Sequence, residues 1–347
     1  MPTLWFILVA LMLTIYVVLD GFDLGAGAIH LFAARNDTER RLILRAIGPV
    51  WDGNEVWLIA AGATLFFTFP LLYASSFSGF YLPLIMVLWL LMLRGVSIEL
   101  RSRIPSSVWS AFWDGLFFLG SALLAIFYGA ALGNVIRGVP LDTNGFFFEP
   151  LWTDFNPFSQ TPGILDWYTV LIGLLALSAL VLHGANYISL KTEDVLHDRS
   201  KRIARGAWLV TVILSIFGTL TTFFVQPMVY TSFTLRPWGI IFPLLALVGL
   251  VGTILWNVRG KDLLAFLASA AFVVGLLASA AFSLYPNVLP AVNPANSLTI
   301  SNASGSLYGQ TVGLVWWIIG MILAAIYFIF TYRLFWGKIR VADAEGH

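Results

Sequence analysis

Long apolar segments separated by short polar connections dominate this chain. A helix needs about 20 mostly apolar residues to cross the hydrocarbon core of a bilayer. Segments of that kind fall at approximately 4–34, 50–74, 77–98, 109–136, 164–190, 203–226, 238–257, 263–284 and 311–336. The pattern therefore predicts an all-α integral membrane protein, a single polytopic domain over residues 1–347 with about nine transmembrane helices. We expect two groups of four helices and one peripheral helix.

Composition supports this class and excludes several others. The chain is 59% hydrophobic and 11% charged, with a mean hydropathy of +0.87, so most of it must lie in lipid. The net charge is +1 and the 19 basic residues are spread along the chain, so no cationic groove for nucleic acid is expected. Cysteine is absent, which excludes disulfides, thiolate-held iron–sulfur clusters and cysteine nucleophiles. We expect no metal site.

The basic residues predict the orientation of the helices. If the N-terminus lies outside, the inner segments carry every Lys and Arg except Arg137 and Arg236, which is 17 of the 19. The opposite orientation would invert this ratio, against the enrichment of Lys and Arg in cytoplasmic connections. We therefore predict an outer N-terminus and a cytoplasmic C-terminus, which fits an odd number of spans.

Acidic residues stand where a membrane disfavours them. Asp20 and Asp23 interrupt the first apolar segment, and Asp52 and Glu55 open the second. A charged side chain at the centre of a membrane helix costs roughly 2.5–3.5 kcal/mol on insertion scales, so such residues mark functional sites by default. Both pairs are spaced three residues apart, which places each pair on one helix face. With the N-terminus outside, all four lie toward the cytoplasm.

Three further residues can support this group. Glu99 and Asp114 stand at the inner ends of the third and fourth segments, and His30 follows Asp23 by seven residues on the same helix face. Carboxyl groups held close together in a poorly solvated site can retain and relay protons. The alternative is simple ion pairing, with Arg94 or Arg101 for Glu99 and Arg45 for Asp52. The first segment offers Asp20 and Asp23 no basic residue before Arg35.

The four histidines provide few candidate ligands for a haem. His183 and His30 are the two that lie within apolar segments, and a low-spin b-type haem normally needs two axial ligands facing one cavity. We expect His183 to be a hydrogen-bonded interior residue. The outer connection 137–163 is aromatic and acidic. Its aromatic residues suit either packing on the outer face of a partner or a belt at the lipid headgroups.

Several motifs resemble one family. They are Leu19-Asp20-Gly21-Phe22-Asp23-Leu24-Gly25-Ala26-Gly27, Arg35-Asn36-Asp37-Thr38-Glu39-Arg40-Arg41, and Gly48-Pro49-Val50-Trp51-Asp52-Gly53-Asn54-Glu55-Val56-Trp57-Leu58-Ile59. Together with Phe77-Ser78-Gly79-Phe80-Tyr81 and Arg94-Gly95-Val96, they are similar to subunit II of the cytochrome bd-type quinol oxidases, including the cyanide-insensitive branch. The dense resemblance covers roughly residues 15–105.

The resemblance implies a haem-free subunit of a terminal oxidase in the bacterial cytoplasmic (inner) membrane. Such a complex oxidises quinol, reduces dioxygen to water and builds proton-motive force. The resemblance places the haems b and d in a larger partner, subunit I, and implies no activity for the chain alone. It also implies that a small accessory subunit can be present, and that a quinone or lipid can sit in this chain as a structural element.

The resemblance connects the acids to a mechanism. Dioxygen reduction consumes protons, and we hypothesise that Asp52, Asp23, Asp20 and Glu55 line a cytoplasmic proton path toward the partner's haems. Asp52 is the strongest candidate and Asp23 the next. Two alternatives compete: the motif serves only to fix the first helices against the partner, or the chain is a secondary transporter. Intramembrane acids and glycine-broken helices suit a transporter too, but the odd span count and the absence of a visible inverted repeat oppose it.

Overall fold

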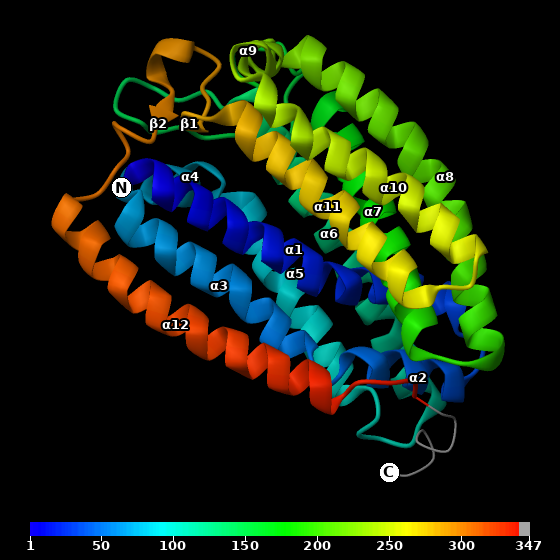
Figure 1. Cartoon of the computed structure of the whole chain (residues 1–347). Helices are drawn as coiled ribbons and strands as arrows, with labels where there is room; N and C mark the ends of the chain where they lie inside the picture. The colour runs from blue at the N-terminus through cyan, green and yellow to red at the C-terminus, as the bar shows by residue number, and fades with distance from the viewer. Residues whose placement is uncertain (340–347) are drawn as a thin grey trace.

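The computed structural model describes residues 1–339, and these form an almost entirely helical bundle (Figure 1). The α-helices are α1 (Pro2–Ala33), α2 (Asp37–Ile47), α3 (Trp51–Thr68), α4 (Pro70–Gly79), α5 (Tyr81–Leu100), α6 (Ser107–Arg137), α7 (Trp167–Lys191), α8 (Asp194–Val225), α9 (Met228–Leu235), α10 (Ile241–Val258), α11 (Asp262–Leu284) and α12 (Leu307–Leu334). Two 3₁₀ turns, η1 (Pro237–Ile240) and η2 (Pro294–Asn296), and two short antiparallel strands, β1 (Asn287–Leu289) and β2 (Leu298–Thr299), complete the described part.

Eight of the described helical segments are long and apolar enough to cross a membrane, which confirms the predicted all-α membrane class. They are α1, α5, α6, α7, α8, η1 with α10, α11 and α12. Helix α3, which lies in the predicted segment 50–74, is the one predicted span that is not among these eight. It packs along α1 (Figure 1), but Asp52, Asn54 and Glu55 in its first turns lower its mean apolarity.

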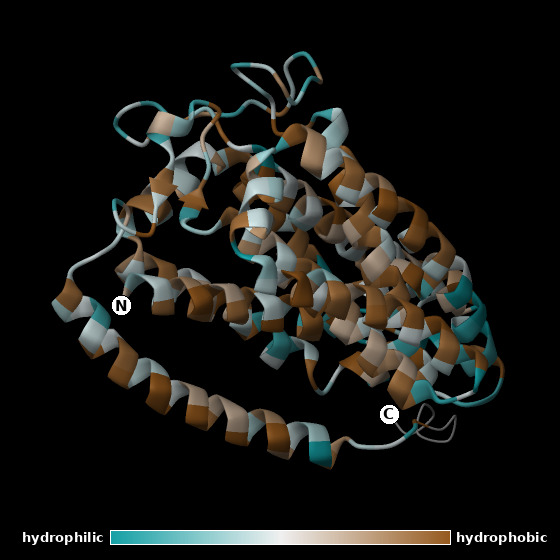
Figure 2. Cartoon of the chain, turned by 45° about the horizontal axis from the view of Figure 1, so that its top comes forward, coloured by the Kyte–Doolittle hydropathy of each residue, from teal (hydrophilic) through white to brown (hydrophobic). Residues whose placement is uncertain are grey.

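The helices associate in two groups of four with one helix outside them. Helices α1, α3, α5 and α6 contact one another, as do α7, α8, α10 and α11. The groups meet where α7 packs on α1 and α6. Helix α12 contacts α3, reaches α1 through Trp317, and lies at the edge of the bundle (Figure 2). This arrangement agrees with the predicted two groups and peripheral helix.

The range 50–74, expected as one segment, is divided in the structure. Helix α3 ends at Thr68, and α4 begins at Pro70. Proline lacks a backbone N–H and fixes φ, so it suits the first turn of a helix and interrupts the middle of one. The freed carbonyl of Thr68 accepts a hydrogen bond from the amide of Gly305 at 2.8 Å, which anchors the connection before α12.

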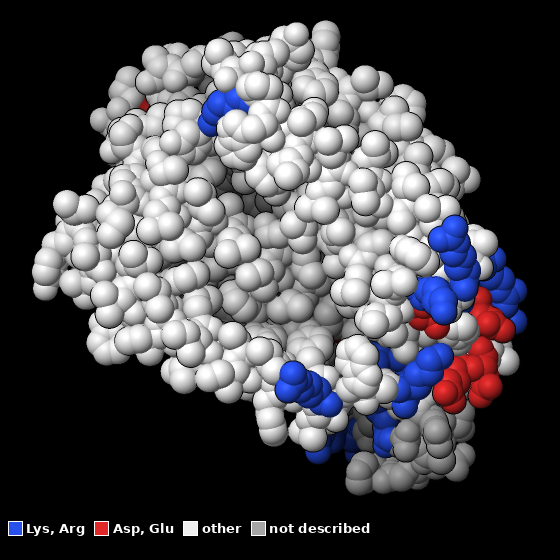
Figure 3. Space-filling model, viewed as in Figure 1, with Lys and Arg blue, Asp and Glu red and all other residues white. Residues whose placement is uncertain are grey.

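Charged side chains gather at one end of the bundle. The view in Figure 3 shows blue and red side chains around α2 and the adjoining ends of α8, α10 and α11, while the sides of the bundle are almost free of charge. The acids of α1 (Asp20 and Asp23) and of α3 (Asp52 and Glu55) lie toward this end. The opposite end carries the connection 138–166 and the β1–β2 hairpin, which touch where Val139 pairs with Ala291.

Candidate functional site: a buried acid cluster

A fully buried arginine joins two of the predicted acids. Arg94, on α5, donates to Asp20 Oδ1 at 2.6 Å and to Glu55 Oε2 at 3.0 Å. The side chains of Arg94 and Asp20 are inaccessible to solvent, whereas that of Glu55 is 22% exposed. Glu55 therefore forms the solvent-facing end of a charged network that continues into the bundle. We call the network of Asp20, Asp23, Asn54, Glu55 and Arg94 the inner acid cluster.

Asp23 is held by a neutral partner. Asn54, on α3, donates from Nδ2 to Asp23 Oδ2 at 2.8 Å, and its own Oδ1 accepts from the hydroxyl of Tyr332 at 3.0 Å. One oxygen each of Asp20 and Asp23 is buried without a hydrogen-bond partner in the described part of the chain. Buried polar atoms are normally paired with protein or water. These two oxygens are therefore positions where water or a bound proton would be stabilised.

Close helix packing positions these acids. A Cβ atom built on Gly25 would collide with the backbone carbonyl of Leu180 on α7, and one on Gly184 would collide with the backbone of α1 at Ala26. Small residues allow such approaches between membrane helices. The glycines between and beyond Asp20 and Asp23 thus seat α1 directly against α7, so the opposite side of α1 can present its carboxylates to α3 and α5.

Asp114 belongs to a second ion-paired network. Its carboxylate accepts from Arg101 Nε at 2.6 Å and from Arg40 at 2.8 Å, and it lies 2.6 Å from His30 Nε2. Arg101 also donates to Asp37, at the start of α2, at 2.7 Å. Burial opposes ionisation of Asp37, but the hydrogen bonds and charges of Arg101 and Arg41 hold its pKa below the usual range. This network fixes α2 against α1, α5 and α6 as an ion-paired clamp.

Two predicted residues lie apart from both networks. Asp52 is solvent-exposed in the isolated chain and, in the described residues, forms no ion pair with Arg45 or any other base. Glu99 is exposed at the end of α5 and pairs with neither Arg94 nor Arg101; its nearest base is Arg103 at 3.9 Å. The structure thus brings Asp20, Asp23 and Glu55 together, groups Asp114 with His30, and leaves Asp52 and Glu99 at the surface.

The buried histidines do not suit haem ligation. Both ring nitrogens of His183 are engaged, Nδ1 with Ser269 at 2.7 Å and Nε2 with the carbonyl of Val18 at 3.0 Å, and its ring stacks on Phe266. His30 is tied to Asp114. The two rings therefore serve as interior hydrogen-bonding groups and do not face a shared cavity.

A second buried ion cluster lies at the opposite end of the bundle. Arg137, at the end of α6, donates to Glu149 at 2.7 Å, to Asp166 and to Asn134. Asp166 also caps α7 by accepting from the amides of Tyr168 and Thr169. Burial raises the pKa of Glu149 to about 8, although the charge of Arg137 lowers it. One arginine here balances two carboxyl groups, and the cluster anchors the connection 138–166.

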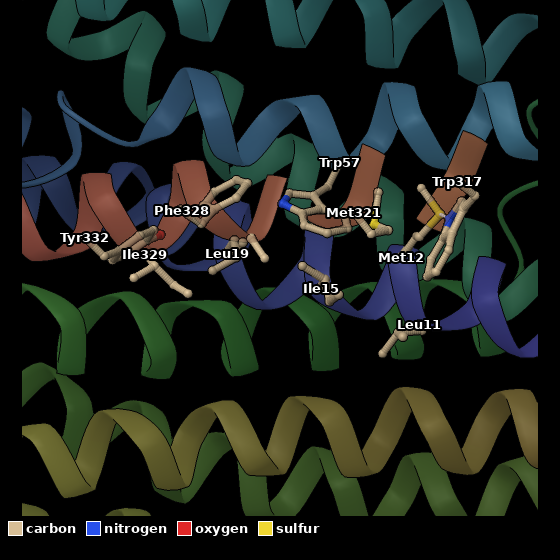
Figure 4. A pocket seen from close by; sticks show the side chains of 11 residues that line it. Leu11, Met12, Ile15, Leu19, Trp57, Trp317, Met321, Phe328, Ile329 and Tyr332 are labelled. Carbon is tan, nitrogen blue, oxygen red and sulfur yellow. Dashed lines mark hydrogen bonds between the residues drawn. The ribbon is translucent and has the colours of Figure 1, made fainter. Parts of the chain in front are cut away.

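An apolar groove of about 540 Å³ separates α12 from α1 and α3. Figure 4 shows Trp57, Trp317 and Phe328 extending into this space from α3 and α12. The indole nitrogen of Trp57 is buried there without a partner in the described residues. The remaining lining is aliphatic or sulfur-containing: Leu11, Met12, Ile15, Leu19, Met321, Ala325 and Ile329, with Tyr332 at one end.

The sequence analysis missed the central role of Arg94 and Asn54. In the sequence, Arg94 serves to predict orientation and is a possible partner of Glu99, whereas in the structure it binds Asp20 and Glu55. An arginine inside an apolar segment is itself a sign of a buried partner. Asn54 stands between Asp52 and Glu55, and nothing in the spacing alone indicated that it, rather than Asp52, would face α1. The cluster of Arg137, Glu149 and Asp166 gave no sequence signal, because its members come from three separate segments.

The bundle and its buried carboxylates define a polytopic membrane protein that holds ionisable groups within the bilayer. Residues 1–335 match the family described as "Cytochrome bd terminal oxidase subunit II", and the chain belongs to this family. With its apolar helices and its bacterial relatives, it is a multi-pass protein of the bacterial inner membrane.

Similar proteins agree with this assignment. The chain is 32% identical to "Cytochrome bd-I ubiquinol oxidase subunit 2" of Escherichia coli, over 99% of this chain and 96% of that protein. It is 31% identical to "Cytochrome bd ubiquinol oxidase subunit 2" of Bacillus subtilis, over 89% and 88%. It also resembles a chain in "The structure of bd oxidase from Geobacillus thermodenitrificans", with a TM-score of 0.71, 15% identity and coverage of 96% and 98%, which shows a shared fold.

Proposed function

We propose that this chain is the haem-free subunit II of a bd-type quinol oxidase, which oxidises quinol and reduces dioxygen to water. Membership of the family over nearly the whole chain supports this function. The haems b and d then reside in a larger subunit I, in keeping with two buried histidines that are already hydrogen-bonded. A small accessory subunit can complete the complex. The chain alone is inactive.

The chain is further proposed to form one membrane domain with its N-terminus outside. The charge distribution supports this orientation, because 17 of the 19 Lys and Arg residues then fall on the cytoplasmic side. In that orientation the inner acid cluster opens to the cytoplasm through Glu55. Protons consumed in dioxygen reduction would then be drawn from the cytoplasm, which makes turnover contribute to proton-motive force.

The observation that carries a proton path is the charge imbalance of the inner acid cluster. Three carboxyl groups, Asp20, Asp23 and Glu55, share the single cation Arg94. Like charges held together in a poorly solvated site cannot all stay ionised, so the cluster favours retaining a proton. Asp52, exposed one turn before Glu55 on the path from the cytoplasm, would collect protons at the entrance.

Substitutions in the purified complex test this path. We expect Asp20→Asn and Asp23→Asn to lower quinol-driven oxygen consumption by roughly 10²-fold or more, the scale of a lost proton-transfer group. The smaller effect of Asp52→Asn should grow as the pH of the assay buffer rises. Asp154→Asn, on the exposed outer connection, is the matched control.

The haem absorbance of each complex separates the alternatives. Normal haem content with slow turnover supports the path. Lost haem or lost subunit I in the Asp20 and Asp23 variants indicates that the cluster only holds the helices together. Full haem content with native turnover in these two variants would refute the proton path and leave subunit II as a scaffold.

We also propose that the groove beside α12 holds the tail of an isoprenoid quinone as a structural element. Its lining is almost wholly apolar, and the unpartnered indole N–H of Trp57 can donate to a carbonyl oxygen. The groove lies between membrane helices, where such a molecule would enter from the lipid.

A further inference from the structure

A pair of tyrosines lies one helical turn beyond Asp20. The hydroxyl of Tyr16, on α1, donates to that of Tyr128, on α6, at 2.8 Å, and the two rings meet edge to face. Tyr16 precedes Asp20 by four residues, so it lies on the same face of α1, about 6 Å further from the cytoplasmic end. Tyr16 is 2% exposed and Tyr128 is half-buried.

The hydrogen bonds leave complementary groups open on this face. Asp20 Oδ2 is buried without a donor, and the hydroxyl hydrogen of Tyr128 has no acceptor among residues 1–339. A hydroxyl group rotates freely and both donates and accepts. Since Tyr16 donates its own hydrogen to Tyr128, the Tyr16 oxygen can accept from a water molecule held at Asp20 Oδ2, while the hydrogen of Tyr128 can pass to an acceptor beyond the pair.

The hydrophobic cluster around Tyr16 contains Met12, Trp57 and Ala61. The indole nitrogen of Trp57 is buried without a partner among the described residues. The charged groups nearest to Tyr16 are Asp20 on its own helix and Arg94 on α5, which belong to the inner acid cluster. The tyrosine pair therefore provides hydrogen-bonded hydroxyl groups on the side of Asp20 that faces away from the cytoplasmic end.

We propose that Tyr16 and Tyr128 extend the proton path from Asp20 toward the middle of the membrane. This inference rests on the proposed function of the inner acid cluster. One hydroxyl oxygen accepts a proton from the Asp20 side while the pair releases a hydroxyl proton at its other end, so both tyrosines stay neutral. Because Tyr128 reaches the surface of this chain, the pair ends where a partner subunit can accept the proton.

The test uses Tyr16→Phe and Tyr128→Phe in the complete oxidase, since these changes remove one hydroxyl and keep the ring. Tyr168→Phe is the matched control, because Tyr168 is buried and its hydroxyl bonds Thr222 in the other helix group. We expect each single variant to lower quinol-driven oxygen consumption roughly tenfold at unchanged haem content. The double variant should be no slower than either single one, because the two hydroxyls act as one unit.

Two further readouts make the result decisive. If the tyrosine substitutions break the proton path, the solvent deuterium isotope effect on turnover should increase. If the tyrosines only pack the helices, this isotope effect should stay unchanged. Native turnover in both single variants, or slow turnover accompanied by lost haem, would overturn the inference. If Asp20→Asn is slow while the tyrosine variants are native, only the extension fails; if Asp20→Asn is native as well, the proposed proton path fails with it.

Discussion

At the scale of single residues, this chain stabilises buried charges by partners from other helices. Asp20 and Arg94 are separated by 74 residues in the sequence, yet they form an ion pair with both side chains inaccessible to solvent. Removing one partner of such a pair strands the other charge, at a typical cost of about 3–5 kcal/mol. Assembly of the first helix group is therefore tied to these side chains, which is why haem content must accompany every activity measurement.

Glu149 gives the chain a pH-dependent stability at the end of the bundle opposite α2. Its pKa is raised to about 8 by burial, whereas an unfolded glutamate titrates near about 4.3. Between these values the folded chain keeps a proton that the unfolded chain has released. Stability therefore falls as pH rises through this window and levels off above it.

We expect Glu149→Gln to flatten this dependence, because glutamine does not titrate. Thermal unfolding of the purified complex from pH 5 to pH 9 measures it, and Asp154→Asn on the same connection serves as the control. An unchanged slope in Glu149→Gln complexes would show that another group dominates the pH response.

The sequence predicted which acids lie close together better than it predicted their partners. Asp20, Asp23 and Glu55 do converge at one end of the bundle, as their positions within apolar segments indicated. The amide of Asn54 faces α1, whereas the carboxylate of Asp52 is exposed. Helical spacing fixes relative angles within one helix but not the rotation of that helix against its neighbours, and membrane helices are apolar on most faces.

At the scale of helices, glycines decide how closely α1 and α7 approach. We expect Gly25→Ala to destabilise the complex by about 1–3 kcal/mol, the usual cost of overpacking, because the added methyl meets the backbone carbonyl of Leu180. Gly206→Ala, on α8, is the control, since a Cβ there meets nothing within 4 Å. Thermal inactivation of the two variants compares them directly. Equal stability would contradict the close-packing role of Gly25.

The end of α3 before Pro70 can be predicted from the sequence. A proline within an apolar run marks the probable start of a new helix, and Phe69-Pro70 divides the range 50–74 into α3 and α4. A count of apolar residues joins α3 and α4 into one segment, because no polar connection separates the two helices.

At the scale of the whole molecule, α12 is attached differently from the other long helices. The two groups of four pack on each other along α1, α6 and α7, whereas α12 contacts α3 and reaches α1 through Trp317, with the apolar groove between them. A groove between membrane helices is filled by side chains, lipid or another apolar molecule. Its volume of about 540 Å³ and its aromatic walls suit a flexible unsaturated chain.

Identification of the co-purified apolar molecules tests this assignment. Organic extraction of the oxidase, followed by mass spectrometry, should yield an isoprenoid quinone in addition to phospholipid. We expect Met321→Trp, which fills the groove from α12, to reduce the bound quinone severalfold while quinol-driven turnover is retained, because we assign to the groove a structural quinone and not the oxidation site. Leu323→Trp is the matched control, since Leu323 is an exposed residue of the same helix that does not line the groove.

Recovery of phospholipid alone from the native complex would assign the groove to a lipid acyl chain instead. Equal quinone content in both variants would place any bound quinone elsewhere.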